Sequence, residues 1–205
     1  MITIIDYNMG NVASIQNILK RIGVDALITS QPSDIRNADK IILPGVGSFD
    51  YGMKNLNDLG ITEVLKEKIL IGNTPLLGIC LGMQLLTEGS EEGTLKGLGF
   101  IKAHTIKFRP EYNGEKIKIP HMGWDYVHPK SDTGLFNNSL ENMRFYFVHS
   151  YFVNCENEEN VLATTEYGIK FASSIGKDKI LGVQFHPEKS HKYGMNLLKN
   201  FVEMV

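Results

Sequence analysis

The residues with the clearest chemical potential surround one cysteine. Cys80 is the centre of GICLG, residues 78–82, where an apolar run ends and another begins. This glycine spacing is typical of a nucleophile elbow, a sharp strand-to-helix turn, with cysteine in place of serine. A thiol at a helix N-terminus is favoured as thiolate, and the N–H of Leu81 would point toward a developing oxyanion. A small buried cysteine in a tight turn fits the same five residues. These residues alone therefore do not distinguish a nucleophile from a core cysteine.

A cysteine nucleophile needs a base, and His186 is the strongest candidate. It ends the apolar strand KILGVQF, and open α/β sheets place ligands at the carboxyl ends of strands. Glu188, two residues later, could hold the imidazole from its other nitrogen, which would complete a nucleophile, base and orienting group with Cys80. Alone, FHPEK fits a plain turn with a solvated glutamate; together with the elbow we favour the triad. The other histidines of the expected strands and loops fit surface or satisfied core positions: His104, His121, His128 and His149.

Two further features lie where such a site would form. The segment PGVGSF, residues 44–49, follows an expected strand, and its glycines would let backbone N–H groups turn toward a substrate. Gln84 comes four residues after Cys80, on the same face of the expected helix. The glycine segment also fits a simple strand-to-helix turn, and Gln84 also fits a residue of the pocket wall. Neither feature alone establishes a substrate site.

The elements that must position these residues follow from the hydrophobic pattern. In the first half, short apolar runs alternate with amphipathic stretches, which indicates right-handed crossovers and a parallel sheet. The expected strands are 1–6, 25–29, 40–45 and 74–79, and the expected helices are 11–23, 49–70 (one or two helices) and 81–89. The second half predicts strands at 99–108, 115–127, 144–153, 160–168 and 170–186, then a helix at 193–205. We therefore expect one domain, residues 1–205, with an α/β three-layer sandwich whose central sheet is mostly parallel and partly antiparallel in its second half.

Composition narrows the function classes. The 205 residues carry 21 Lys and Arg against 23 Asp and Glu, a net charge of −2, so no basic excess indicates nucleic acid or an anionic membrane. No apolar run reaches the ~18 residues of a membrane helix, and the N-terminus does not resemble a signal peptide, so we expect a cytoplasmic protein with Cys80 and Cys155 reduced. Neither a CxxC pair nor a clustered set of His and Cys is present, so we expect no metal and no cofactor.

Longer motifs around these residues resemble a known family. PLLGICLGMQLL, residues 75–86, and GVQFHPEKS, residues 182–190, are similar to the class I (triad) glutamine amidotransferases. The resemblance implies that Cys80 attacks the side-chain amide of glutamine, His186 moves the proton and Glu188 orients it. A glutamyl thioester would form and ammonia and glutamate would leave. Two rivals remain: another cysteine-elbow enzyme, such as a small peptidase or redox chaperone, and a non-catalytic subunit of this fold.

Other segments resemble one branch of that family, the glutaminase subunits of imidazole glycerol phosphate synthases. These segments are IIDYNMGNVASIQNIL, LPGVGSFDYGM, PHMGWD and YFVHSYF, and the likeness runs from Asp6 to the last helix. Asn8 departs from the pattern, which more often has glycine there. The cysteine and histidine motifs alone would also fit glutaminase subunits for anthranilate, GMP, CTP or pyridoxal phosphate synthesis.

This resemblance implies a partner and a set of site residues. The partner is a cyclase subunit of (β/α)8-barrel fold, joined in a heterodimer, that uses the ammonia to make imidazole glycerol phosphate and aminoimidazole carboxamide ribotide in histidine biosynthesis. The implied oxyanion hole is Val46 and Leu81, completed by a turn of the Gly45–Val46 peptide that the partner would gate. The implied glutamine site is Gly45, Gly47, Gln84, Glu92, Ser150 and Tyr151. The implied partner interface is Asn11, Trp124, Tyr146 and Lys189, although Trp124 also fits a core aromatic.

Overall fold

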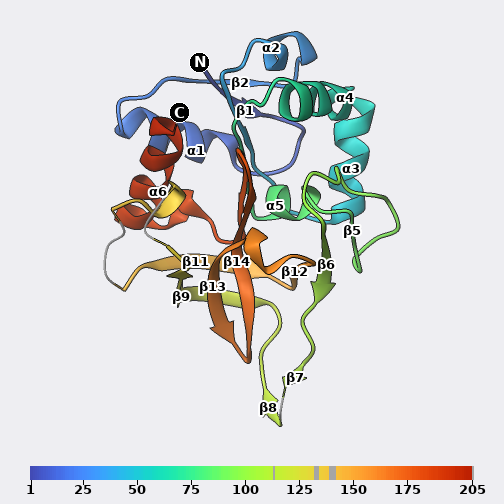
Figure 1. The fold of residues 1–205 in the computed structure, drawn as a ribbon, viewed down its shortest axis with the longest axis vertical. Coiled ribbons are helices and arrows are strands. Elements are labelled where there is room, and N and C mark those ends of the chain that lie inside the picture. The colour runs from blue at the N-terminus through green and yellow to red at the C-terminus, as the bar shows by residue number, and fades with distance from the viewer. Residues whose placement is uncertain (113, 132–133, 139–141, 205) are drawn as a thin grey trace.

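The parallel half of the sheet forms as the alternation predicts. A computed structural model describes residues 1–112, 114–131, 134–138 and 142–204 (Figure 1). Its first strands are β1 (Ile2–Ile5), β2 (Ala26–Thr29), β3 (Lys40–Leu43) and β4 (Leu76–Ile79). They pair in parallel in the order β2-β1-β3-β4. Every residue of β1 and β4 is buried, as expected for strands covered on both faces.

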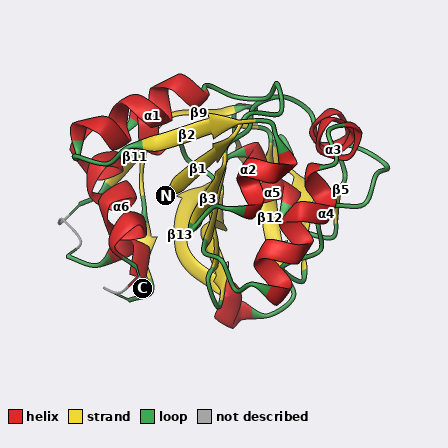
Figure 2. Ribbon diagram, turned by 90° about the horizontal axis from the view of Figure 1, so that it is seen from above, coloured by secondary structure: helices red, strands yellow, loops and turns green. Residues whose placement is uncertain are grey.

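Helices cover both faces of the sheet (Figure 2). On one face lie α1 (Val12–Arg21) and α6 (His191–Glu203), whose apolar residues share one core cluster. On the other lie α2 (Pro32–Arg36), α3 (Phe49–Asp58), α4 (Ile61–Lys66) and α5 (Leu81–Leu85), in a second cluster. A π-helical turn, η1 (Glu67–Ile71), continues α4. The predicted three-layer α/β sandwich is confirmed. None of the helices in the described residues has the length and apolar character needed to cross a membrane.

Antiparallel strands extend the sheet in the second half. Strand β15 (Ile180–Val183) runs parallel to β4 and antiparallel to β14 (Ile169–Lys177). Beyond β14 the order continues through β12 (Tyr151–Cys155), β6 (Ala103–Lys107) and β5 (Gly89–Ser90), while β13 (Val161–Tyr167) pairs with β14 and with β10 (His128–Pro129). The result is one sheet of eleven strands. Short 3-10 turns lie at η2 (Gly134–Phe136), η3 (Glu158–Asn160) and η4 (Pro187–Lys189).

Three segments that were each predicted as one strand form two separate strands in the structure. The segment 144–153 forms β11 (Arg144–His149), which pairs with β9 (His121–Tyr126) in a separate two-stranded sheet, and β12, which joins the main sheet. The segment 170–186 turns at Asp178, whose φ is +55°. The segment 115–127 gives β8 (Glu115–Lys116), paired in a hairpin with β7 (Glu111–Tyr112), and then β9. Apolar runs show burial but not where a strand changes sheets, so the divisions were missed.

Two predicted helix boundaries were also wrong. Helix α5 ends at Leu85 rather than at residue 89, because the N–H of Glu88 donates to the carbonyl of Ala103 at 3.0 Å and the chain enters β5 beside β6. Helix α6 starts at His191, two residues before the predicted start, directly after η4. The early start places the His191 ring against Trp124.

Candidate active site

The sharp turn predicted around Cys80 is present between β4 and α5. Cys80 has φ +54° and ψ −109°, a backbone conformation that non-glycine residues rarely adopt. The flanking glycines permit close passage, since a Cβ at Gly78 would lie 2.6 Å from the carbonyl oxygen of Gly82 and one at Gly82 would lie 1.8 Å from that of Leu43. The strand-to-helix elbow therefore requires both glycines, and it holds a free thiol that is 7% exposed.

His186 reaches the same edge of the sheet because β15 lies directly beside β4. Its Nδ1 lies 2.7 Å from Oε1 of Glu188, and the two side chains are only 2% and 5% exposed. Burial lowers the pKa of His186, but the nearby sulfur of Cys80 and the carboxylate of Glu188 raise that pKa to about 10. Its Nε2 has no hydrogen-bond partner among the described residues. The imidazolium form is thus favoured, and one ring nitrogen remains for chemistry.

Ser190 fixes the position of His186, a contribution that the sequence analysis missed. The Ser190 hydroxyl donates to the carbonyl of His186 at 2.6 Å and accepts from the N–H of Tyr146 at 3.0 Å. The N–H of His186 donates to the carbonyl of Tyr146 at 2.9 Å. This bridge ties the base to strand β11, and the S of FHPEKS was the only sequence signal for it.

The predicted substrate residues line one cavity beside the thiol. The cavity has a volume of about 340 Å³. Its lining residues are Val46, Gly47, Cys80, Leu81, Gln84, Glu92, Pro120, Val148, His149, Ser150 and Tyr151. Of the implied glutamine residues, only Gly45 is not part of this lining. Glu92 also accepts the N–H of Phe49 at 2.8 Å, so its carboxylate caps the start of α3 across the cavity. Segments from both halves of the chain therefore build the pocket.

The implied oxyanion hole is not assembled in this conformation. The N–H of Leu81 donates to the carbonyl of Gly45 at 3.2 Å, so that oxygen occupies the place an oxyanion would take. The Gly45–Val46 peptide thus presents its acceptor inward, and the Val46 side chain is 46% exposed. A turn of this peptide is needed before Val46 and Leu81 could both donate.

Gln184 is the second residue that the sequence analysis missed. It is fully buried, and its Nε2 lies 3.7 Å from the sulfur of Cys80. Its Oε1 accepts from Nε2 of Gln84 at 3.1 Å. A buried amide on an otherwise apolar strand, two residues before His186, was the available signal, because such groups need internal partners.

Three of the four implied interface residues, Trp124, Tyr146 and Lys189, lie together. Nζ of Lys189 lies 5.5 Å from the ring centre of Tyr146, and the Trp124 ring stacks on His191 at 5.5 Å and faces Tyr146 at 6.3 Å. Trp124 is 44% exposed, which argues against a core position. Asn11 is exposed and accepts the N–H of Ser14, which caps α1.

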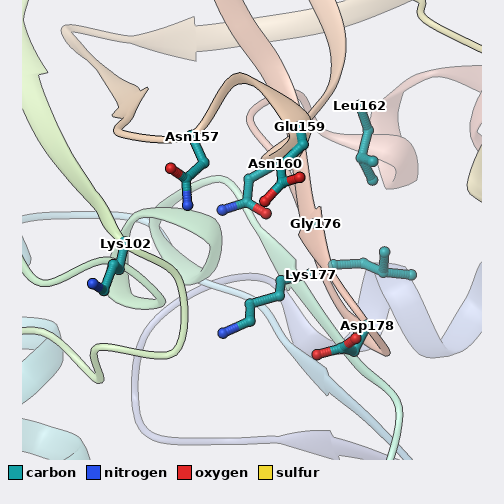
Figure 3. Close-up of a pocket in the computed structure, with 9 residues that line it drawn as sticks. Lys102, Asn157, Glu159, Asn160, Leu162, Gly176, Lys177 and Asp178 are labelled. Atoms are coloured by element: carbon teal, nitrogen blue, oxygen red, sulfur yellow. The ribbon is translucent and has the colours of Figure 1, made fainter.

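A larger cavity, of about 640 Å³, lies elsewhere on the molecule (Figure 3). Lys102, Lys177 and Asp178 line it, next to the turn that precedes β15. That turn is at the opposite end of β15 from His186, so this cavity is remote from the thiol. Within the described ranges, no group of three or more His, Cys, Asp or Glu side chains is arranged to hold a metal ion.

Comparisons with known proteins agree with this geometry. The profile of the family Glutamine amidotransferase class-I matches residues 3–205. Imidazole glycerol phosphate synthase subunit HisH 2 of Methanococcus maripaludis is 59% identical over 203 residues, 99% of each chain, and the protein of the same name from Pseudomonas aeruginosa is 45% identical over 205 residues, 100% of each chain. A solved glutamine amidotransferase has a TM-score of 0.75 at 19% identity, covering 98% of this chain and 97% of that one, which supports the fold. With its elbow, its histidine–glutamate pair and these full-length relatives, the chain belongs to the class-I glutamine amidotransferase family and, within it, to the HisH subunits of imidazole glycerol phosphate synthase.

Proposed function

We propose that residues 1–205 form one glutaminase domain that supplies ammonia to imidazole glycerol phosphate synthase in histidine biosynthesis. The observation that carries this proposal is the convergence of Cys80, the His186–Glu188 pair and a cavity sized for a small substrate. Relatives that match over their whole length carry the subunit's name, which favours this synthase over one for anthranilate, GMP, CTP or pyridoxal phosphate. We further propose a cytoplasmic location, since the reaction needs a reduced thiol.

The reaction begins at the sulfur. The thiolate of Cys80 attacks the side-chain amide carbon of glutamine, and the carbonyl oxygen becomes an oxyanion. His186 gives a proton from Nε2 to the leaving nitrogen, so ammonia departs and a glutamyl thioester remains. Water then loses a proton to His186 and attacks the thioester, which releases glutamate and returns the thiolate. Glu188 stays ionised throughout and holds the ring by Nδ1.

The closed oxyanion hole supports control of hydrolysis by a partner. In the observed conformation the carbonyl of Gly45 would face the developing oxyanion, and two oxygens of like charge repel each other. Turning the Gly45–Val46 peptide would replace that acceptor with a donor. Since one oxyanion donor contributes about 100- to 1,000-fold in rate, this turn is a sufficient switch. We propose that binding of the cyclase subunit favours the turned peptide, so that glutamine is not hydrolysed without an acceptor for ammonia.

A surface suited to that partner lies beside the site. Alternate residues of β9 point outward, and Met122, Trp124 and Tyr126 are 61%, 44% and 44% exposed. Aromatic residues and methionine are enriched in protein interfaces. We propose that a (β/α)8-barrel cyclase covers this strip together with Asn11, Tyr146 and Lys189, and that the contact excludes water, because water would protonate ammonia in transit.

The Cys80→Ala variant of the complex with the cyclase tests the proposal. Glutamine-dependent synthesis should disappear, while synthesis from added ammonium salt should persist, because only the glutaminase step uses the thiol. If glutamine still supports synthesis in this variant, Cys80 is not the nucleophile. If the wild-type chain releases glutamate only with another synthase subunit, the assignment to histidine biosynthesis is wrong.

A further inference from the structure

Two buried histidines connect the pocket to the carboxylate of Asp125 on β9. Nδ1 of His149 lies 2.7 Å from the carbonyl oxygen of Tyr151, and its Nε2 lies 3.1 Å from Nδ1 of His121. Nε2 of His121 then lies 3.2 Å from Oδ2 of Asp125. The two histidines are 2% and 6% exposed, and the Asp125 side chain is 27% exposed. Four groups from β9, β11 and β12 thus form one chain of short polar contacts.

The two neutral imidazoles carry too few protons to make every contact of this chain a hydrogen bond. Each end, the carboxylate of Asp125 and the carbonyl of Tyr151, can only accept, and two imidazoles stand between them. Three gaps separate the four groups, and each hydrogen bond needs one proton. Two neutral imidazoles carry only two N–H groups between them. One more proton must therefore reside on the chain before all three contacts are hydrogen bonds; otherwise two lone pairs face each other at one gap.

The same Tyr151 carbonyl determines the polarity of a second chain that ends at the nucleophile. It accepts from Nε2 of Gln84 at 3.2 Å, which fixes that amide with its nitrogen inward. The second proton of this nitrogen donates to Oε1 of Gln184 at 3.1 Å. Gln184 must then present its own Nε2 to the sulfur of Cys80, where the distance is 3.7 Å. Because the Tyr151 carbonyl can only accept, the Gln184 amide presents its N–H group to the sulfur of Cys80.

We propose that four residues position the site for glutamine hydrolysis: Asp125, His121, His149 and Gln184. A proton shared by His121 and Asp125 completes the hydrogen bonds that hold the Tyr151 carbonyl in place. This carbonyl in turn orients the amides of Gln84 and Gln184 toward the pocket and the sulfur. The inference rests on the proposed function. Tyr151, Gln84 and His149 line the substrate cavity. The completed chain of hydrogen bonds should therefore affect mainly the KM for glutamine.

The surroundings of the two rings decide when the extra proton is present. Burial lowers the pKa of His121, and the charge of Asp125 opposes this without cancelling it. Burial lowers the pKa of His149 to about 3, so His149 is neutral and the proton belongs to His121. Tyr167 stacks on His121, but its hydroxyl donates to the carbonyl of Lys118. The charge of His186 further lowers the pKa of His149, and Nδ1 of His186 is paired with Glu188. Neither Tyr167 nor His186 therefore supplies the third proton.

The Asp125→Asn variant distinguishes this arrangement from an ordinary ion pair. An asparagine amide donates an N–H to Nε2 of His121 and closes the chain with both histidines neutral. In the wild-type complex with cyclase, KM for glutamine should rise as the pH increases through the titration of His121. Asp125→Asn should keep the low KM and lose that pH dependence. Asp125→Leu leaves Nε2 of His121 buried without a partner and should raise KM about tenfold. Equal losses in both variants would overturn the proposal.

An activity-independent measurement separates failure of this inference from failure of the proposed function. Side-chain ¹⁵N NMR of the full chain reports which ring nitrogen carries hydrogen. We expect His149 protonated on Nδ1 alone and His121 protonated on Nδ1, with a second proton gained at acidic pH. His149 protonated on Nε2 alone would refute the chain whatever the complex hydrolyses. Asp178→Asn, at an exposed turn, is the matched control and should leave both spectra and KM unchanged.

The Gln184→Glu variant tests the end of the chain at the sulfur. It keeps the shape of the side chain but replaces the donor to Cys80 with a carboxylate oxygen. We expect kcat to fall about 100-fold with KM changed less than threefold, since the sulfur is affected more than the pocket. A change in KM alone would show that Gln184 only shapes the pocket and would remove it from the proposal.

Discussion

Replacing Glu188 with glutamine tests the charge that supports the proposed base. Glu188 Oε1 lies 2.7 Å from Nδ1 of His186, and both side chains are almost fully buried, so water screens the pair little. Burial lowers the pKa of His186, but Cys80 and Glu188 raise it from 6.5 to about 10. That difference corresponds to about 5 kcal/mol in favour of the imidazolium. A substantial part should be lost when one of the two supporting groups becomes neutral.

The expected effect on catalysis follows from that energy. A hydrogen bond to a charged group contributes about 1.5–3 kcal/mol, so Glu188→Gln should lower kcat about 10- to 100-fold. KM for glutamine should change little, because Glu188 does not line the substrate cavity. Glutamate release by the complex with cyclase, measured over a range of glutamine concentrations, separates the two parameters. The control is Glu158→Gln, whose side chain is 91% exposed and which should behave as wild type.

Stability should change with pH in a defined direction. Because the pKa of His186 is raised on folding, its contribution to the free energy of unfolding is complete below pH 6.5 and disappears as the pH rises to about 10. Glu188→Gln should therefore be less stable than wild type at pH 6, and the difference should shrink to nothing near pH 10. Urea unfolding across this range measures it. A kcat within threefold of wild type, together with a pH-independent stability difference, would refute the reasoning.

Two other substitutions test the site and its surroundings. Burial raises the pKa of Tyr7, and its hydroxyl has no hydrogen-bond partner among the described residues, so Tyr7→Phe should stabilise the chain by about 1 kcal/mol and raise Tm by about 2–4 °C. A lower Tm in calorimetry would mean that the hydroxyl has a partner. Trp124→Ala should weaken cyclase binding by about 2 kcal/mol or more, as expected for an exposed aromatic anchor, while the isolated chain stays folded. Unchanged affinity by calorimetric titration would remove Trp124 from the proposed interface.

Much of the fold was predictable because it follows from the local pattern of apolar and polar residues. The four parallel strands of the first half follow from short apolar runs between amphipathic helices, and all four were placed within two residues. The second half was predicted less well. The segment 144–153 is uniformly rich in aromatic residues, so nothing in its pattern indicates that Ser150 separates two strands in different sheets. Helix α5 was overextended because its end depends on pairing between β5 and β6, not on its own residues.

The elbow at Cys80, the position of His186 and Glu188 after a strand, and the family could all be predicted from the amino-acid sequence. Those features depend on near neighbours: glycine spacing, a strand end and two adjacent side chains. The surroundings of the sulfur could be read only from the folded chain. The Gly45 carbonyl on the N–H of Leu81, the Gln184 amide beside the thiol and the His121–His149 pair all join segments that are distant in the chain. Such contacts depend on strand order and register, and hydrogen-bond direction depends on which groups meet. No local pattern of residues encodes either.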